Sequence, residues 1–120
     1  GDAVVIGNPI QLEQVFINLL NNSRDAMAHA PERRIYVCCS ISDGMAEVRF
    51  CDSGPGIPEG LEQRIFDPFF TTKEVGEGTG LGLSITYSII KDHEGTITVE
   101  KTPPEGGAVF VIRLPLAAGE

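Results

Sequence analysis

A stretch of alternating apolar and polar residues, divided by a tight turn, constrains the fold of this chain most. The apolar members of residues 35–42 fall on one face, namely Ile35, Val37, Cys39 and Ile41. Asp43-Gly44 is typical of a two-residue hairpin turn. Such a turn pairs Ile41 with Ala46 and Val37 with Phe50, so the apolar faces of the two strands coincide. The sequence therefore predicts an antiparallel hairpin across residues 35–52.

Residues 9–30 carry the pattern of a long amphipathic helix ahead of this hairpin. Apolar or small residues recur at helical spacing and form one broad face: Leu12, Val15, Phe16, Leu19, Leu20, Ser23, Ala26 and Met27. Asn8 is placed to cap the helix, Pro9 suits its first position, and Pro31 is expected to stop it.

The remaining segments complete a two-layer pattern. A short strand is expected at residues 1–6, a short helix at 61–65, a second long helix at 80–94 with Gly95 as its C′ residue, and strands near 96–100 and 108–114. This order predicts an α+β two-layer sandwich, with a mixed, mostly antiparallel sheet and helices on one face. Residues 1–120 form one domain, expected to be cut from a longer chain.

Charge and composition exclude several classes of partner. The net charge of −8 argues against a nucleic-acid surface, which needs a basic footprint. No apolar run is long enough to cross a bilayer and no signal peptide is visible, so no direct membrane contact is expected. The cysteines, Cys38, Cys39 and Cys51, lack metal-ligand spacing and are interpreted as buried or half-buried thiols of a reducing compartment, which favours the cytoplasm.

The polar face of the first helix is built from carboxamides and not from charged residues. Asn18, Asn21 and Asn22 lie within five residues, although asparagine is a poor helix former. An amide oxygen is a neutral, hard ligand that can bind Mg²⁺ beside phosphate groups without adding negative charge. The alternative is an ordinary surface helix with an unusual share of asparagine.

Asp52 continues the core-facing side of the hairpin two residues after Phe50. A carboxylate there is costly unless it is hydrogen-bonded or paired. It is either a turn residue that closes onto the amides of Ser53-Gly54, or an acceptor at the floor of a ligand pocket.

A glycine-rich segment, Gly78-Thr79-Gly80-Leu81-Gly82, directly precedes the second long helix. Glycines at a helix start let backbone N–H groups approach phosphate oxygens. The segment is neither a P-loop nor a Rossmann turn, because it lacks the Gly-Lys-Ser/Thr ending and follows no strand. Joined with the carboxamides, Asp52 and the cation of Lys73, it predicts a Mg²⁺–nucleotide site in which Asp52 accepts from the exocyclic amine of adenine.

Four motifs in this order resemble the boxes of the catalytic ATP-binding domain of sensor histidine kinases, within the gyrase, Hsp90, histidine kinase and MutL ATPase group. They are Asn18-Leu-Leu-Asn-Asn22-Ser-Arg-Asp-Ala, Asp52-Ser-Gly-Pro-Gly56, Phe66-Asp-Pro-Phe-Phe-Thr-Thr-Lys73 and Gly78-Thr-Gly-Leu-Gly-Leu83. The resemblance covers nearly the whole chain and implies a Bergerat-type ATP-binding fold.

The resemblance also implies roles for individual residues. Asn22 is expected to ligate Mg²⁺, with Asn18 one turn earlier supporting the metal and the phosphates, and Lys73 completes the expected catalytic set. Asp52 is expected to read adenine, and residues 66–80 to form an ATP lid. The full expected ATP site is Asn18, Asn22, Asp25, Asp52, Gly54, Gly56, Ile57, Phe66, Lys73, Gly78, Thr79, Gly80, Leu81, Gly82 and Leu83.

Departures from the family pattern refine this hypothesis. Many members have Lys or Arg where Asp25 stands, so Lys73 is expected to supply the positive charge. ATPase members resemble one another in a water-activating Glu four residues before the metal-binding Asn; Asn18 stands there and cannot act as a general base. Phosphoryl transfer is therefore favoured over hydrolysis.

By the same resemblance, the phosphate acceptor is a histidine on an upstream dimerisation domain, and the parent kinase serves a response regulator. His29 and His93 are not expected to be phosphorylated. The alternative function is that of an ATPase or serine-kinase relative of the same fold group.

Overall fold

The computed structural model of the chain describes residues 5, 7–27, 34–54, 56–57, 60–62, 64–67, 82–100 and 107–117. The strand expected at residues 1–6 lies outside the described residues, apart from Val5, which packs against the core.

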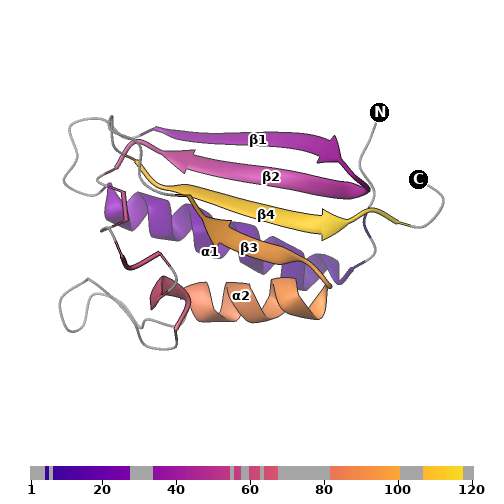
Figure 1. The fold of residues 1–120 in the computed structure, drawn as a ribbon. Coiled ribbons are helices and arrows are strands. Elements are labelled where there is room, and N and C mark those ends of the chain that lie inside the picture. The colour runs from indigo at the N-terminus through magenta and orange to yellow at the C-terminus, as the bar shows by residue number, and fades with distance from the viewer. Residues whose placement is uncertain are drawn as a thin grey trace.

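A helical layer lies on one face of an antiparallel sheet (Figure 1). The elements are α1 Pro9–Ala26, β1 Ile35–Ser42, β2 Met45–Asp52, the 3₁₀ turn η1 Arg64–Phe66, α2 Gly82–Asp92, β3 Thr96–Val99 and β4 Val109–Pro115. The four strands are ordered β1-β2-β4-β3, and every described pair is antiparallel. This arrangement confirms the predicted α+β sandwich. In place of the short helix expected at 61–65, the structure has only η1.

The hairpin is confirmed residue by residue. Val37 pairs with Phe50 and Ile41 with Ala46. Both turn residues take positive φ, 55° at Asp43 and 74° at Gly44, as this kind of turn requires. The two turn residues thus set the register of the β1–β2 hairpin.

The helices end differently from their sequence-based prediction. Asn8 caps α1 as expected, since its Oδ1 accepts from the N–H groups of Ile10 and Gln11 at 3.0 and 3.1 Å. However, α1 ends at Ala26, with Met27 as its C-cap, and not at Ala30.

After α2, the left-handed position belongs to Glu94, with φ 61°, and not to Gly95. Gly95 serves close packing, because a Cβ there would lie 2.4 Å from the carbonyl oxygen of Arg113.

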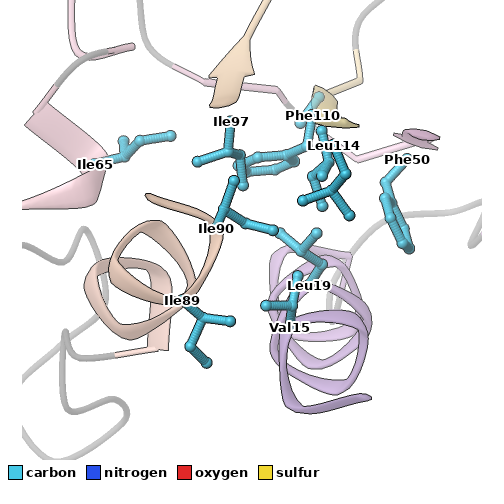
Figure 2. Close-up of a cluster of buried hydrophobic side chains, with 11 residues drawn as sticks. Val15, Leu19, Phe50, Ile65, Ile89, Ile90, Ile97, Phe110 and Leu114 are labelled. Carbon is cyan, nitrogen blue, oxygen red and sulfur yellow. The ribbon is translucent and has the colours of Figure 1, made fainter. Parts of the chain in front are cut away.

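One buried cluster joins both helices to the three strands above them (Figure 2). Its members include Val15, Leu19, Phe50, Ile89, Ile90, Ile97, Phe110, Ile112 and Leu114. The rings of Phe16 on α1 and Phe50 on β2 lie 5.6 Å apart, which fixes α1 beneath β2. On α2, Ile85 and Tyr87 are exposed, whereas Thr86 is fully buried.

The edge strand β1 lies outside this cluster. All of its residues are exposed, including Val37 and Ile41, which were expected to face the core. Cys38 and Cys39 are therefore exposed free thiols, contrary to the expectation of burial, whereas Cys51 on β2 is half-buried.

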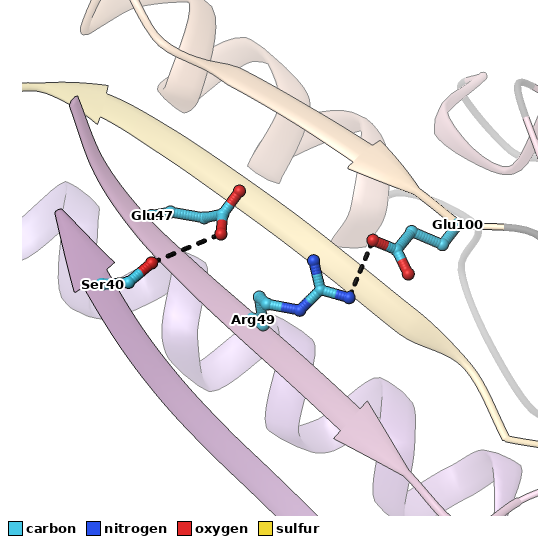
Figure 3. Close-up of polar contacts among 4 residues, drawn as sticks. All are labelled: Ser40, Glu47, Arg49 and Glu100. Carbon is cyan, nitrogen blue, oxygen red and sulfur yellow. Dashed lines mark hydrogen bonds and ion pairs between the residues drawn. The ribbon is translucent and has the colours of Figure 1, made fainter. Parts of the chain in front are cut away.

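Polar contacts link strands on the outer face of the sheet. Arg49 on β2 forms an ion pair of 2.7 Å with Glu100, which follows β3, so the contact spans β4 (Figure 3). The hydrogen bond with Glu100 raises the pKa of the Arg49 guanidinium. Ser40 donates a longer bond, 3.4 Å, to Glu47 on the same face.

At the end of the fold where α1 begins, a depression of about 510 Å³ is lined by residues from both ends of the described chain. They include Gly7, His93, Leu116 and Ala117. At 1.5 Å per residue, Asn22 lies roughly 20 Å further along α1.

Candidate active site

Three element ends that carry predicted site residues lie toward the same end of the fold: the C-terminal ends of α1 and β2 and the N-terminal end of α2 (Figure 1). Ser53, just after β2, donates to the sulfur of Met27, just after α1, at 3.4 Å. Asn18 on α1 contacts Gly82, the first residue of α2. These contacts bring together segments that are far apart in the sequence.

Asp52 is buried, with only 9% of its surface exposed. Its Oδ1 accepts from the backbone N–H groups of Gly54 at 2.9 Å and Ala108 at 3.1 Å. Among the described residues, no donor reaches Oδ2. The two amides offset the cost of burying the charge and leave one carboxylate oxygen for a further donor. The first alternative for Asp52 is confirmed, because its Oδ1 closes onto the N–H of Gly54. Its role as an acceptor at the floor of a ligand pocket stays a prediction.

The chain just before β4 approaches Asp52 closely at Gly107. This glycine has φ 93°, and a Cβ there would lie 2.3 Å from the Asp52 carbonyl oxygen. The backbone N–H of Asp52 donates to the Ala108 carbonyl at 3.0 Å. Asp52 is thus held from both its backbone and its side chain.

Asn22 is half-buried near the end of α1, and none of the described residues forms a hydrogen bond with its carboxamide. Asp25, one turn on, lies 3.6 Å from Arg24 in an exposed ion pair, which contributes little to stability. The amide of Asn22 is available to a ligand from outside the chain.

Asn18 is engaged by the protein. Its Nδ2 donates to the Gly82 carbonyl at 3.3 Å and to the Thr86 hydroxyl at 3.2 Å. Its Oδ1 accepts from Gln14 at 2.7 Å. Asn18 therefore bridges the two helices.

The remaining described members of the predicted site lie at residues 56–57, in η1 and at the start of α2. Gly56 takes φ 83°, and Ile57 packs against the core. The ring of Phe66 lies 5.7 Å from that of Tyr87 and 6.4 Å from that of Phe110, so it anchors η1 to the body of the domain. Gly82 is exposed at the start of α2, and Leu83 contacts the core.

Lys73, Gly78, Thr79, Gly80 and Leu81 lie outside the described residues, as does most of the predicted ATP lid. Their expected roles stay predictions.

The sequence analysis missed Thr86 and Gln14, which contact Asn18. Thr86 could have been found, because Leu83, Thr86 and Ile90 share the helical spacing of a buried face.

Two further properties concern only the part of the chain that the structure describes. No cluster of three or more His, Cys, Asp or Glu side chains there could hold a metal ion. None of its helices combines the length and apolarity needed to cross a membrane.

Comparison with known proteins identifies the family of this chain. Residues 7–118 match the family described as histidine kinase-, DNA gyrase B-, and HSP90-like ATPase. Two-component sensor PprA of Pseudomonas aeruginosa is 47% identical over 96% of this chain. The C4-dicarboxylate transport sensor protein DctB of Rhizobium meliloti is 41% identical over 93% of it. The chain spans only 13% and 17% of the lengths of these two relatives.

Solved structures agree with the sequence relatives. The mycobacterial sensor histidine kinase MprB matches with a TM-score of 0.81 at 32% identity, covering 93% of this chain and 74% of that one. The catalytic domain of histidine kinase ThkA matches with a TM-score of 0.78 at 39% identity, covering 92% and 70%. The chain therefore belongs to the histidine kinase-, DNA gyrase B- and HSP90-like ATPase family, as an ATP-binding domain of the sensor histidine kinase type.

Proposed function

We propose that this domain binds Mg-ATP and donates the γ-phosphoryl group to a histidine on a separate dimerisation domain of its parent chain. It would thus be the catalytic part of a cytoplasmic two-component sensor kinase that serves a response regulator. The sensor kinases to which it is similar support this proposal.

The arrangement of Asp52 is the observation that carries the proposal. A buried carboxylate with one oxygen held by two backbone amides and the other open to a donor suits the exocyclic amine of adenine. Guanine has a carbonyl oxygen at the same position, which would face the carboxylate with like charge. Gly54 and Gly56 would border the base beside it.

The residues present also fit a magnesium ion. Mg²⁺ prefers oxygen ligands and is usually held by one or two protein groups together with substrate phosphates and water. Asn22 offers a neutral oxygen that no described residue occupies, and Asn18 lies one turn earlier. When bound, the ion would neutralise charge on the triphosphate. Lys73 and the amides of residues 78–83 would contact the phosphates.

The chemistry at Asn18 favours transfer over hydrolysis. A carboxamide has no basic site at neutral pH, and both hydrogens of Nδ2 are directed at α2. Catalysis would then rest on positioning and charge neutralisation, without a general base to activate water.

A phosphotransfer assay tests the proposal. The 120-residue chain would be mixed with the dimerisation domain of its parent protein and ATP labelled at the γ-phosphate. We expect acid-labile, base-stable label on the dimerisation domain. Label on His29 or His93, or steady phosphate release without transfer, would refute the proposal; the second result would favour the ATPase relative.

Nucleotide titration separates binding from transfer. We expect Mg-ATP to bind more tightly than Mg-GTP, since Asp52 reads the amine. Absence of Mg-ATP binding would leave a domain that only docks to a partner.

A further inference from the structure

Thr86 is the most deeply buried polar side chain described, with no exposed surface, although it lies on a helix whose other buried residues are isoleucines. Its hydroxyl donates to the carbonyl of Gly82, one turn earlier, at 2.9 Å. That bond alone would satisfy the buried hydroxyl. The same oxygen also accepts from Nδ2 of Asn18 at 3.2 Å.

The contacts fix the orientation of the Asn18 carboxamide. A backbone carbonyl can only accept, so the atom of Asn18 that faces Gly82 must be the nitrogen. Its two hydrogens then point to the Gly82 carbonyl and the Thr86 hydroxyl, and its oxygen points to Gln14. Asn18, Gly82 and Thr86 form a closed triangle of hydrogen bonds between α1 and α2.

This triangle lies between the two segments that are proposed to bind the triphosphate and its metal ion. Gly82 is the first residue of α2, and a helix start directs its N–H groups at an anion. Asn22, the proposed metal ligand, lies one turn beyond Asn18 on α1. The angle between the two helices therefore sets the distance between the phosphate-binding amides and the metal-binding amide.

We propose that Thr86 is a positioning residue for the phosphates of the bound nucleotide. Acting through Asn18 and Gly82, its hydroxyl holds the start of α2 in register with the metal-binding turn of α1. This inference rests on the proposed function, because it assigns Thr86 to the same ATP site. Thr86 itself does not touch the nucleotide.

Thr86→Val tests the role, because valine has nearly the same shape but lacks the hydroxyl. We expect affinity for Mg-ATP to fall about threefold to tenfold, the effect of losing one hydrogen bond. Affinity for adenosine, which lacks phosphates, should be unchanged. Thr86→Ser should bind ATP within about twofold of the unsubstituted chain, since it retains the hydroxyl. Ser88→Ala, at an exposed hydroxyl of the same helix, is the matched control.

A double-mutant cycle adds a second criterion. Asn18→Ala and Thr86→Val should not be additive in their effect on ATP affinity, since both break the same triangle. Full additivity, or equal loss of ATP and adenosine binding by Thr86→Val, would overturn the inference in favour of a general packing role. Unchanged ATP binding by a folded Thr86→Val would also overturn it.

Two measurements on the unsubstituted chain remain informative if Thr86→Val does not fold. The side-chain amide protons of Asn18 should exchange slowly with water by NMR, and fast exchange would contradict the triangle. If the unsubstituted chain does not bind Mg-ATP, the proposed function fails first and the inference with it. If the unsubstituted chain binds Mg-ATP but the Thr86 variants do not show the expected affinities for ATP and adenosine, only the inference about Thr86 is refuted.

Discussion

The imidazole of His93 accepts a hydrogen bond from the backbone N–H of Asn8, with 3.0 Å between Nε2 and the nitrogen. Its other nitrogen, Nδ1, lies 2.8 Å from the carbonyl oxygen of Ile89. Because a carbonyl only accepts, Nδ1 carries the hydrogen and Nε2 is the acceptor. The end of α2 is thereby joined to the start of α1, and His93 has a structural role.

Removal of this contact should affect stability but not nucleotide binding. His93→Ala loses the bond to Asn8 and should lower the free energy of unfolding by about 1 kcal/mol, or the melting temperature by about 3–6 °C. ATP affinity should be unchanged, because the site lies at the other end of α1. A large loss of ATP affinity would mean that His93 communicates with the site.

Gly7 gives this prediction an internal check. A Cβ at Gly7 would lie 2.5 Å from Cδ2 of His93, so Gly7→Ala should cost about 1–3 kcal/mol in the unsubstituted chain. In the His93→Ala background the imidazole is absent, and the same substitution should cost much less. Denaturant unfolding of the four proteins measures the difference; equal costs in both backgrounds would contradict the contact.

Asp52→Asn should reverse the base preference of the site. The asparagine oxygen can keep the two bonds from Gly54 and Ala108, which places its NH₂ group where Oδ2 now lies. The amine of adenine would then meet a donor, and ATP affinity should fall about tenfold to a hundredfold. The carbonyl of guanine would meet a matching donor, so the ratio of ATP affinity to GTP affinity should fall by more than ATP affinity alone. Calorimetric titration of both nucleotides measures this, and unchanged ATP affinity would remove Asp52 from the base pocket.

Asn22→Ala should make ATP binding independent of magnesium. If Asn22 is the metal ligand, affinity in Mg²⁺ should drop to the level measured in EDTA, while affinity in EDTA stays the same. Asn21→Ala is the matched control, because Asn21 is an exposed asparagine on the same turn. Both variants should be at least as stable as the unsubstituted chain, since alanine favours a helix more than asparagine does. If magnesium still increases ATP affinity in Asn22→Ala, a residue other than Asn22 is the metal ligand.

The three cysteines should differ in reactivity. Burial raises the pKa of the Cys51 thiol, so at any pH below that pKa it has less reactive thiolate than an ordinary cysteine. Iodoacetamide at pH 7.5 should therefore modify the exposed Cys38 and Cys39 before Cys51, and raising the pH should narrow the gap. Mass spectrometry of timed samples measures the order, with the unfolded chain as control. Early modification of Cys51 would contradict its burial.

The hairpin of β1 and β2 could be predicted from the sequence, because its turn residues determine how the two strands pair. Asp43-Gly44 allows one turn geometry, and that turn fixes every pair of the hairpin, including Val37 with Phe50. The burial of Asp52 followed from the same alternation. The position of β1 in the sheet was not predictable, because whether a strand is covered depends on where distant helices pack.

The helix ends and the Thr86 contact could not be predicted from sequence patterns, because they depend on packing between segments that are distant in the sequence. Pro31 sets only an outer limit to α1, and the helix ends earlier, at Ala26. After α2, Glu94 takes the left-handed conformation and Gly95 allows close packing. This arrangement depends on β4, because the carbonyl of Arg113 leaves no room for a side chain at Gly95. Likewise, the hydroxyl of Thr86 can accept from Asn18 only because α1 packs beside α2.

Gly7 and Ala117 border the same depression, at the end of the fold remote from Asn22 and Asp52. The segments at Gly7 and Ala117 therefore leave the residues of the candidate site uncovered.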